Sequence, residues 1–181
     1  KHDHFLLETS NGKILIFNDP RRFGFIDYDL YKMINSRKYL TSLGIDALSN
    51  SFIGPYLFSK ISKSIVPIKQ ILLNQTIIAG IGNIYASEIL FNAKISPLKR
   101  GKDLKLNNCN MICKSSRKIL KKAINSGGST LRDFVSTDGT LGNFQNNFKV
   151  YNREGKKVSG KIVKKIIQYG RSTYFCPFIQ K

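Results

Sequence analysis

The sequence has 181 residues, of which 41% are hydrophobic and 23% are charged, which is typical of a folded globular protein and disfavours wholesale disorder. Lys and Arg total 30 against 11 Asp and Glu, which gives a formal net charge of +19. Such a charge favours a polyanionic partner, and nucleic acid is favoured over an anionic membrane. The alternative is that a genome biased toward Lys and Asn codons raises the charge without a functional reason. No apolar run approaches the ~20 residues of a membrane span, and no signal peptide is expected in the first residues.

The chain is predicted to begin with β structure. Apolar runs at 5–7 and 14–17 flank Asn11-Gly12, the strongest short hairpin signal, because both residues tolerate a positive φ. Asp19-Pro20 then predicts a turn, and residues 21–26 are expected to return as a strand.

The pattern becomes helical from about residue 31 to 125. A short apolar helix is expected at 68–73, and apolar residues at i, i+3, i+4 and i+7 predict a helix with Asn83 as its N-cap. A longer helix over 107–125 should end at Gly127-Gly128, because glycine accepts the left-handed conformation. Its expected buried stripe consists of Cys109, Ile112, Cys113, Ser116, Leu120, Ala123 and Ile124. Its expected opposite face is basic and consists of Lys114, Arg117, Lys118, Lys121 and Lys122.

Residues 126–147 show no clear period, and they predict a long loop of functional importance with a short helix near 131–135. β structure is expected again over 148–181, with alternation at 162–167, a turn at 169–171 and a strand at 172–175. The fold class predicted is therefore mixed α+β.

Two short motifs are candidate nucleic-acid contacts. Gly80-Ile81-Gly82-Asn83 opens a helix whose free N–H groups form a phosphate site, unless it is a plain helix–helix turn. In the turn 19–24, Arg21 could fill a vacated base position and Phe23 could wedge between bases. The alternative for this turn is a surface Arg pair beside a core Phe.

Other candidate groups are few. His2 and His4 make a poor metal site, so a phosphate contact or a neutral place at the strand edge is favoured. The three cysteines are odd in number and lack C-x2-C spacing, which indicates reduced thiols in the cytoplasm. Interleaved basic and aromatic residues near the C-terminus suit a DNA groove better than a solvated face: Lys156, Lys157, Lys161, Lys164, Lys165, Tyr169, Arg171, Tyr174 and Phe175.

Together these motifs resemble one family, the formamidopyrimidine-DNA glycosylases, over essentially the whole chain. The strings that carry the resemblance are KHDH (1–4), DPRRFG (19–24), GIGNIYASE (80–88), GGSTLRDF (127–134) and GRSTYFCP (170–177). The resemblance implies base-excision repair of oxidised purines such as 8-oxoguanine by a DNA glycosylase with AP lyase activity, which flips the base out of the duplex. Damaged double-stranded DNA is the implied partner, and a monomer without membrane association is expected.

The resemblance also implies an architecture. Residues 1–30 would be the last strands of a catalytic β-sandwich domain. Residues 31–147 would be a helix–two-turn–helix DNA-binding domain, in which 129–148 form a mobile loop over the damaged base. Residues 148–181 would be a β-hairpin finger.

Site residues follow from the same resemblance. Asn83 and Arg171 match residues that bind the phosphates flanking the flipped nucleotide. The resemblance also assigns Arg171 to the elimination step. We interpret that role as electrostatic, because guanidinium is a poor acid. Arg21 and Phe23 match the residues that fill the hole and wedge the stack. The implied DNA-binding set is His2, Arg21, Phe23, Lys63, Lys69, Gly82, Asn83 and Arg171.

Two departures from the family pattern matter. The family nucleophile is an N-terminal proline, expected upstream of Lys1 together with a glutamate and a lysine, so residues 1–181 are expected not to catalyse alone. The family zinc finger uses two C-x2-C pairs, whose positions here are Lys156, Ser159, Cys176 and Ile179. One thiol cannot hold a tetrahedral zinc, so a zincless finger is predicted, with Cys176 the one remaining candidate ligand.

Three hypotheses stay open on the sequence: part of a glycosylase and lyase, a non-catalytic DNA-binding remnant of a split or degrading gene, and a ribosomal-type RNA-binding protein. The Arg21–Phe23 pair and the string 170–176 favour DNA repair over the ribosome.

The net charge predicts that binding to duplex DNA depends steeply on salt. Each Lys or Arg that neutralises a phosphate releases counterions, so the logarithm of the binding constant should fall with the logarithm of the salt concentration by about 0.9 per contact. Fluorescence anisotropy with a labelled duplex from low to physiological salt measures this slope. A slope near zero would contradict the electrostatic interpretation.

Overall fold

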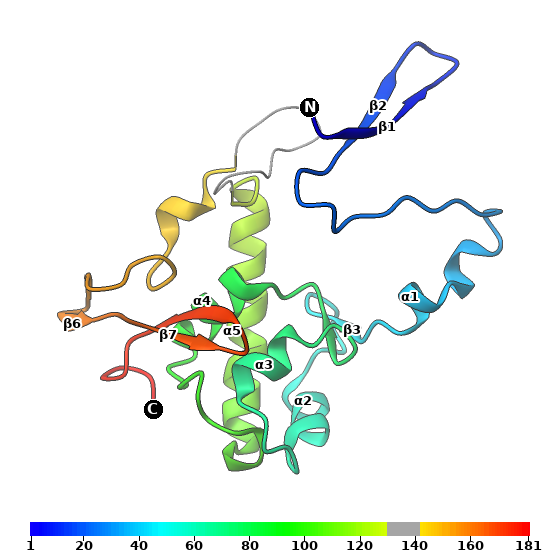
Figure 1. Cartoon of the computed structure of the whole chain (residues 1–181). Coiled ribbons are helices and arrows are strands. Elements are labelled where there is room, and N and C mark those ends of the chain that lie inside the picture. The colour runs from blue at the N-terminus through cyan, green and yellow to red at the C-terminus, as the bar shows by residue number, and fades with distance from the viewer. Residues whose placement is uncertain (130–141) are drawn as a thin grey trace. The chain divides into compact units, whose positions relative to one another are not determined.

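The computed structural model describes residues 1–129 and 142–181, in which α-helices are combined with two-stranded sheets (Figure 1). This confirms the mixed α and β class. The chain forms two compact units, Lys1–Thr41 and Ser42–Lys181. Within the described ranges, no helix is long and apolar enough to cross a membrane.

The first unit begins with the predicted β-hairpin. Strands β1 (Asp3–Glu8) and β2 (Ile14–Asn18) are antiparallel, with Leu6 opposite Ile16. Gly12 closes the loop with a φ of +74°, a conformation that glycine adopts without strain. No residue of this unit is buried, and the apolar side chains of both strands are exposed to solvent except for half-buried Phe17.

Residues 21–26 do not form the predicted strand. The Asp19 carboxylate accepts the backbone N–H groups of Arg21 at 3.1 Å, Arg22 at 3.0 Å and Gly24 at 2.6 Å. These N–H groups are then unavailable to a sheet ladder, because a short Asp side chain competes with it for the same donors. The bond from Gly24 is the largest cause of a lowered pKa of Asp19.

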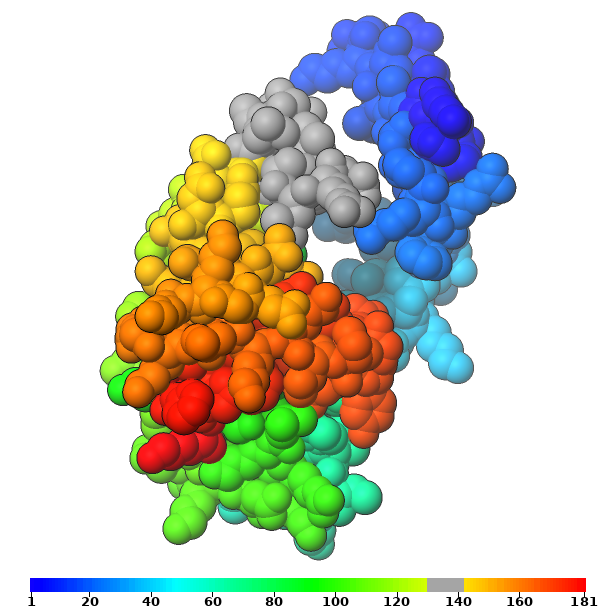
Figure 2. All heavy atoms as spheres, turned by 60° about the vertical axis from the view of Figure 1, so that its left-hand side comes forward, coloured from blue at the N-terminus to red at the C-terminus, as the bar shows by residue number. Residues whose placement is uncertain are grey.

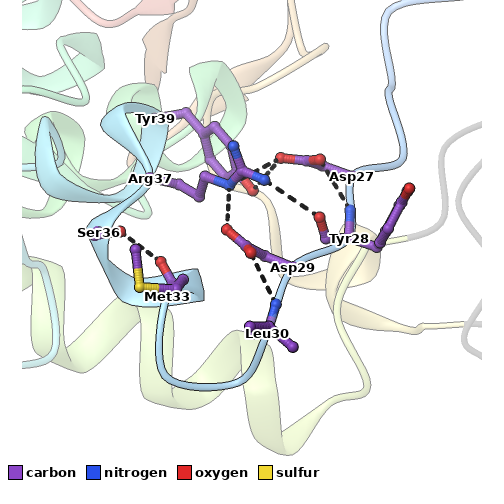
Figure 3. Close-up of polar contacts among 8 residues, drawn as sticks. All are labelled: Asp27, Tyr28, Asp29, Leu30, Met33, Ser36, Arg37 and Tyr39. Atoms are coloured by element: carbon purple, nitrogen blue, oxygen red, sulfur yellow. Dashed lines mark hydrogen bonds and ion pairs between the residues drawn. The ribbon is translucent and has the colours of Figure 1, made fainter.

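Arg37 organises the end of the first unit (Figure 3). Its Nε lies 2.9 Å from Asp29 Oδ2 and 3.5 Å from Asp27 Oδ2, and its Nη2 donates to the Tyr28 carbonyl at 3.2 Å. Tyr39 donates its hydroxyl to Asp27 at 3.2 Å. These contacts tie residues 27–29 to Arg37, which lies between the short helical turns η1 (Ile34–Ser36) and α1 (Lys38–Thr41), and to Tyr39 of α1.

The second unit packs its helices around one apolar core. α2 and α4 both pack on the long helix α5, as Figure 1 shows, and α3 packs on α4. Two short parallel strands, β3 (Ile45–Asp46) and β4 (Ile78–Ala79), join its N-terminal part. The helices are α2 (Gly54–Ile61), α3 (Ile68–Leu73), α4 (Asn83–Asn92), η2 (Gly101–Asp103) and α5 (Leu106–Asn125).

The bounds of α3 and α5 confirm the helices predicted from periodicity. α5 ends as expected, since Gly127 and Gly128 have φ of +70° and +80° and donate back to Ile124 and Ala123 at 3.0 and 2.9 Å. The predicted stripe on α5 is buried except for Ile124, next to the last residue of the helix, which is 62% exposed. Its assignment to the core was wrong.

Arg117 was also assigned to the wrong face of α5. It is half-buried, and its Nη2 donates to the carbonyls of Phe52 at 2.6 Å, Ser49 at 3.2 Å and Asn50 at 3.4 Å. The side chain thus satisfies the loop before α2 instead of facing solvent. Lys114, Lys118, Lys121 and Lys122 are exposed as predicted.

The C-terminal segment forms the predicted hairpin. β7 (Lys164–Gln168) pairs with β8 (Arg171–Phe175) through a two-residue turn at Tyr169-Gly170, both with positive φ. This geometry matches the twist of the two strands. The segment also contains η3 (Phe144–Asn147), β5 (Lys157–Val158) and β6 (Lys161–Ile162). Figure 2 shows residues 142–181 as one band of yellow, orange and red atoms.

Glu88 of α4 holds this segment on the helices. It is 2% exposed, and its carboxylate accepts the N–H groups of Lys149, Val150 and Tyr151 at 2.8–3.1 Å. Four successive aromatic contacts follow the same path, with ring centroids 5.0–5.8 Å apart, through Tyr85, Phe144, Phe148, Tyr151 and Tyr174. A charged acceptor and an apolar cluster therefore fix the start of the C-terminal segment.

Replacing Glu88 by Ala should destabilise the protein strongly. The buried Val150 N–H and the part-buried N–H groups of Lys149 and Tyr151 would lose their acceptor. Leaving a buried donor unsatisfied costs about 1–3 kcal/mol, so we expect a loss of about 2 kcal/mol or more in the free energy of unfolding. Urea denaturation followed by circular dichroism measures it. Glu154→Ala, at an exposed acid, is the control and should change stability by less than about 0.5 kcal/mol. Equal effects would show that the Glu88 bonds contribute nothing particular.

Candidate nucleic-acid interface

A buried ammonium group lies at the centre of the second unit. The Lys69 side chain is 0% exposed, and its Nζ donates to Asn83 Oδ1 at 2.6 Å, Thr173 Oγ1 at 2.7 Å and the Ser172 carbonyl at 3.3 Å. Asn83 Nδ2 donates to the same Ser172 carbonyl at 3.1 Å. One lysine of α3 thus joins the first residue of α4 to strand β8.

Burial lowers the pKa of Lys69 from 10.5 to about 8, with a smaller contribution from the positive charge of Arg171. No carboxylate lies among the three acceptors of Nζ. The group is still mostly protonated at neutral pH, which suits an ammonium whose three N–H bonds are directed at oxygen atoms. Because Lys69 is buried, its ammonium group fixes the positions of Asn83, Ser172 and Thr173. A direct contact between Lys69 and a phosphate stays a prediction.

The start of α4 has no side-chain cap. Asn83 is the first helical residue and Gly82 is the N-cap, so the prediction of Asn83 as N-cap was wrong: its side chain is turned toward Lys69 and Ser172 instead. A Cβ on Gly82 would meet nothing within 4 Å, so the fold itself does not require glycine there. The first-turn N–H groups, at the positive end of the helix dipole, therefore face open space that suits an anion.

Arg171 lies beside this helix start. It is exposed at the first position of β8, next to the tight turn at Tyr169-Gly170. Arg171 and Gly82 line the same shallow depression, with a volume of about 370 Å³, together with Gln70, Leu73, Asn74, Gln75 and Ile81. The structure thus brings together a guanidinium and a helix N-terminus, two groups that bind phosphate.

In the first unit, the Asp19 turn displays the other predicted contacts. Phe23 is 85% exposed, and Arg21 is exposed beside it. A Cβ on Gly24 would lie 2.8 Å from the Phe17 ring, so glycine allows this turn to approach the hairpin closely. His2 is exposed with a φ of +75°, and its carbonyl accepts the Asp19 N–H at 3.0 Å.

Carboxylates do little to neutralise the basic residues. Among the described residues, ion pairs are formed by Arg37 alone. Asp19, Asp46 and Glu88 instead bond to backbone N–H groups. The remaining exposed cations, Lys63 among them, stay available to external anions.

The finger positions do not fit a zinc ion. Lys156 and Ser159 are exposed, Ile179 is apolar, and Cys176 is fully buried with its N–H donated to Gln180 Oε1 at 2.8 Å. No group of three His, Cys, Asp or Glu side chains in the described part of the chain could hold a metal. One thiol supplies a quarter of the ligands that a tetrahedral zinc needs. All three cysteines are free and buried, and burial raises the pKa of Cys109 to about 11 and of Cys113 to about 12.

The proposed loop over the damaged base, residues 129–148, falls mostly on residues 130–141, which lie outside the described residues, as does the helix predicted near 131–135. Its two ends are described. Ser129 and Asn143 form an isolated antiparallel bridge, and Tyr85 Oη lies 3.2 Å from Ser129 Oγ.

Sequence reasoning missed the partners that order the site. Thr173 is 0% exposed and accepts from Lys69, and Glu88 ties α4 to the segment after residue 148. Their separations in sequence, 104 and 61 to 63 residues, leave no local periodic signal. The motif strings that contain them were recognised, but not these contacts.

An uncapped helix start beside an exposed arginine, in a chain of charge +19, defines a nucleic-acid-binding protein. Residues 43–135 match the formamidopyrimidine-DNA glycosylase H2TH domain. A formamidopyrimidine-DNA glycosylase of Zymomonas mobilis is 42% identical over 182 residues, covering 100% of this chain and 67% of that protein. One of Rickettsia africae is 43% identical over 183 residues, covering 99% and 66%. The chain belongs to the formamidopyrimidine-DNA glycosylase family.

Solved structures agree. The MutM (Fpg) protein of Thermus thermophilus superposes with a TM-score of 0.87 at 36% identity, over 99% of this chain and 68% of that one. The Lactococcus lactis Fpg in complex with abasic-site DNA gives a TM-score of 0.90 at 36% identity, over 100% and 67%. The chain therefore spans about two thirds of the length of the relatives it matches.

The Lys69 site predicts a specific pH dependence of stability. The pKa of Lys69 is about 8 in the folded protein and 10.5 in the unfolded chain. Below pH 8 the burial of the charged ammonium therefore destabilises the folded state in full, and this destabilisation disappears as the pH rises from 8 to 10.5. The free energy of unfolding of the native chain minus that of Lys69→Met should therefore rise over this range, by roughly 1–3 kcal/mol. Urea denaturation at several pH values measures it, with Lys121→Met as the exposed control. A difference that does not change with pH would contradict this account.

Proposed function

We propose that this chain binds damaged double-stranded DNA in base-excision repair of oxidised purines, as part of a DNA glycosylase with AP lyase activity. The observation that carries the proposal is the uncapped N-terminus of α4 beside Arg171, ordered by Lys69. Related structures support it. The Lactococcus lactis protein binds abasic-site DNA in one complex and DNA containing Fapy-dG in another, and a MutM complex contains carbocyclic 8-oxo-G DNA.

The phosphates flanking the lesion would bind at two groups. The first-turn N–H groups of α4 and one free amide N–H of Asn83 would take one phosphate, since the other amide N–H is already donated to Ser172. The Arg171 guanidinium would take the next phosphate and stabilise negative charge during strand cleavage, without acting as a proton donor.

The first unit would act on the base stack. Arg21 would occupy the space left by the flipped nucleotide, and the exposed Phe23 ring would wedge between the adjacent bases. His2 and Lys63 would contact the backbone, and residues 129–148 would cover the extruded base. These roles rest on the family resemblance and on the exposure of the side chains.

Strands β1 and β2 would belong to a larger β-sandwich. On one face of the hairpin, Leu6 and Ile16 are opposite each other and are 60% and 56% exposed. On the other face, Leu7 and Leu15 are opposite each other and are 46% and 59% exposed. A two-stranded hairpin with apolar residues open on both faces is marginal in water unless further β structure covers it. Residues 1–30 would thus be part of the sandwich, 31–147 the helix–two-turn–helix domain and 148–181 the finger.

The finger would hold its shape without zinc. Val150, Val163 and Tyr174 form a buried cluster there. Gln180 is 3% exposed and accepts the Cys176 N–H while donating to the Ile95 carbonyl at 3.0 Å, which ties the end of the finger to the residues after α4. Apolar packing and this amide would take over the crosslinking role of the metal.

Asn83→Ala and Arg171→Ala should weaken binding to an abasic-site duplex more than Lys121→Ala. A hydrogen bond to a charged group contributes about 1.5–3 kcal/mol, so the arginine change should weaken binding about tenfold or more, and the neutral Asn somewhat less. Lys121 is exposed on α5, and its charge is mobile and screened. Fluorescence anisotropy at fixed salt compares the three. Equal losses would mean that binding is diffuse charge attraction.

Residues 1–181 alone should bind lesion-bearing DNA without forming a trapped imine. A Schiff base needs an accessible, unprotonated amine, and the one lysine with a lowered pKa, Lys69, is fully buried. Borohydride trapping on an 8-oxoguanine duplex, repeated after acetylation of the Lys1 α-amine, tests this. Trapping and strand cleavage that persist after acetylation would locate a nucleophile inside residues 2–181 and overturn the alternative of a purely DNA-binding segment.

A further inference from the structure

A second cationic cavity lies apart from the phosphate site at the start of α4. It has a volume of about 500 Å³ and is lined by α4, α5 and the segment 144–159. Its basic side chains are Lys118, Lys122, Lys149, Arg153 and Lys157. Except for half-buried Arg153, which donates to the Phe148 carbonyl at 2.9 Å, these cations are exposed.

The cavity opens on the other side of α4 from the site described above. Glu88, Phe91 and Asn92 line it, whereas Asn83 faces Lys69 and β8. Nine helical positions separate Asn83 from Asn92, which corresponds to about 14 Å along the axis and about half a turn beyond two full turns. The two sites are therefore distinct, and one ligand group cannot occupy both.

Acidic groups do not neutralise the cavity. Glu88 is the one carboxylate in its lining, and its oxygen atoms already accept the N–H groups of residues 149–151. No ion pair within the described residues involves any of the five cations. The cavity thus carries an excess of positive charge that neighbouring acids do not cancel.

The cavity also has an apolar wall and free amides. Phe91, Ile119 and Val158 are half-buried and line it. The side chains of Asn92 and Asn147 line it too, and neither has a hydrogen-bond partner among the residues that the structure describes. Cations, free amides and an aromatic edge in one cavity match the chemistry of a nucleotide, which joins a charged phosphate to a flat base.

We propose that this cavity binds a short segment of single-stranded nucleic acid, with phosphates on the cations and a base against the Phe91 wall. The site goes beyond the proposed function, which needs only the α4 start, Arg171 and the first unit. It would let the protein hold an unpaired strand while the lesion site holds duplex DNA. The footprint is small, so a few nucleotides suffice to fill it.

The test is an NMR titration of the ¹⁵N-labelled chain with a 5′-phosphorylated thymidine tetranucleotide. We expect amide shifts at Asn92, Asn147 and Ser159. The double variant Lys118→Gln/Lys122→Gln should weaken this binding at least fivefold. It should also lower the salt slope by about 1.4, because each of the two phosphates that is no longer neutralised accounts for about 0.7. The control is Lys114→Gln/Lys121→Gln, which removes the same charge from exposed positions of the same helix outside the cavity; it should change binding less than twofold.

Three results would overturn the proposal. They are equal weakening by both double variants, shifts confined to Gly82 and Arg171, and tripolyphosphate binding as tightly as the tetranucleotide, which would show an anion site without base recognition. Binding of the abasic-site duplex, measured on the same variants, distinguishes a failure of this second site from a failure of the proposed function. Both double variants should bind that duplex alike.

Discussion

The ammonium group of Lys69 is the constraint on which the arrangement of α4 and β8 in the second unit depends. A fully buried charge is tolerated only when its donors are satisfied, and here the acceptors come from α4 and from β8. Meeting that requirement fixes the orientation of the Asn83 amide and the distance between the helix start and the hairpin. Arg171, at the first position of β8, is thereby held beside the uncapped end of α4. An anion bound at the proposed site would therefore cost little side-chain entropy.

A second principle organises the charges. Three carboxylates of this basic chain, those of Asp19, Asp46 and Glu88, accept backbone N–H groups. Asp19 shapes the turn that displays Arg21 and Phe23, and Glu88 anchors the segment after residue 148. Acids used in this way stabilise turns that would otherwise leave donors unpaired. They are then unavailable to pair with lysines, so the surface keeps its positive potential. The same residues that build the fold thus preserve the attraction for a polyanion.

The C-terminal segment, residues 148–181, is held by packing and hydrogen bonds. Zinc normally links distant chain segments through four side chains, and the residues at those positions here cannot do so. The aromatic contacts from Tyr85 to Tyr174 and the amide of Gln180 connect the same segments by packing and hydrogen bonds. α4 carries both Asn83 at its start and Glu88 in its middle, so this helix contacts β8 through Lys69 and Asn83 and the segment after residue 148 through Glu88.

The sequence by itself determined the elements whose signals are local: the Asn11-Gly12 hairpin, α3, the length of α5 with its double-glycine end, and the Tyr169-Gly170 turn. Its motif strings also identified the family. Tertiary structure alone decided what depends on distant partners. Arg117 donates to carbonyl groups 65 to 68 residues away instead of facing solvent with the other basic residues of α5. Residues 21–26 do not form a strand, because the Asp19 carboxylate accepts their backbone N–H groups. Burial of Lys69 required an acceptor 104 residues further on, because periodicity reports which face of an element is apolar but not which group will lie opposite it.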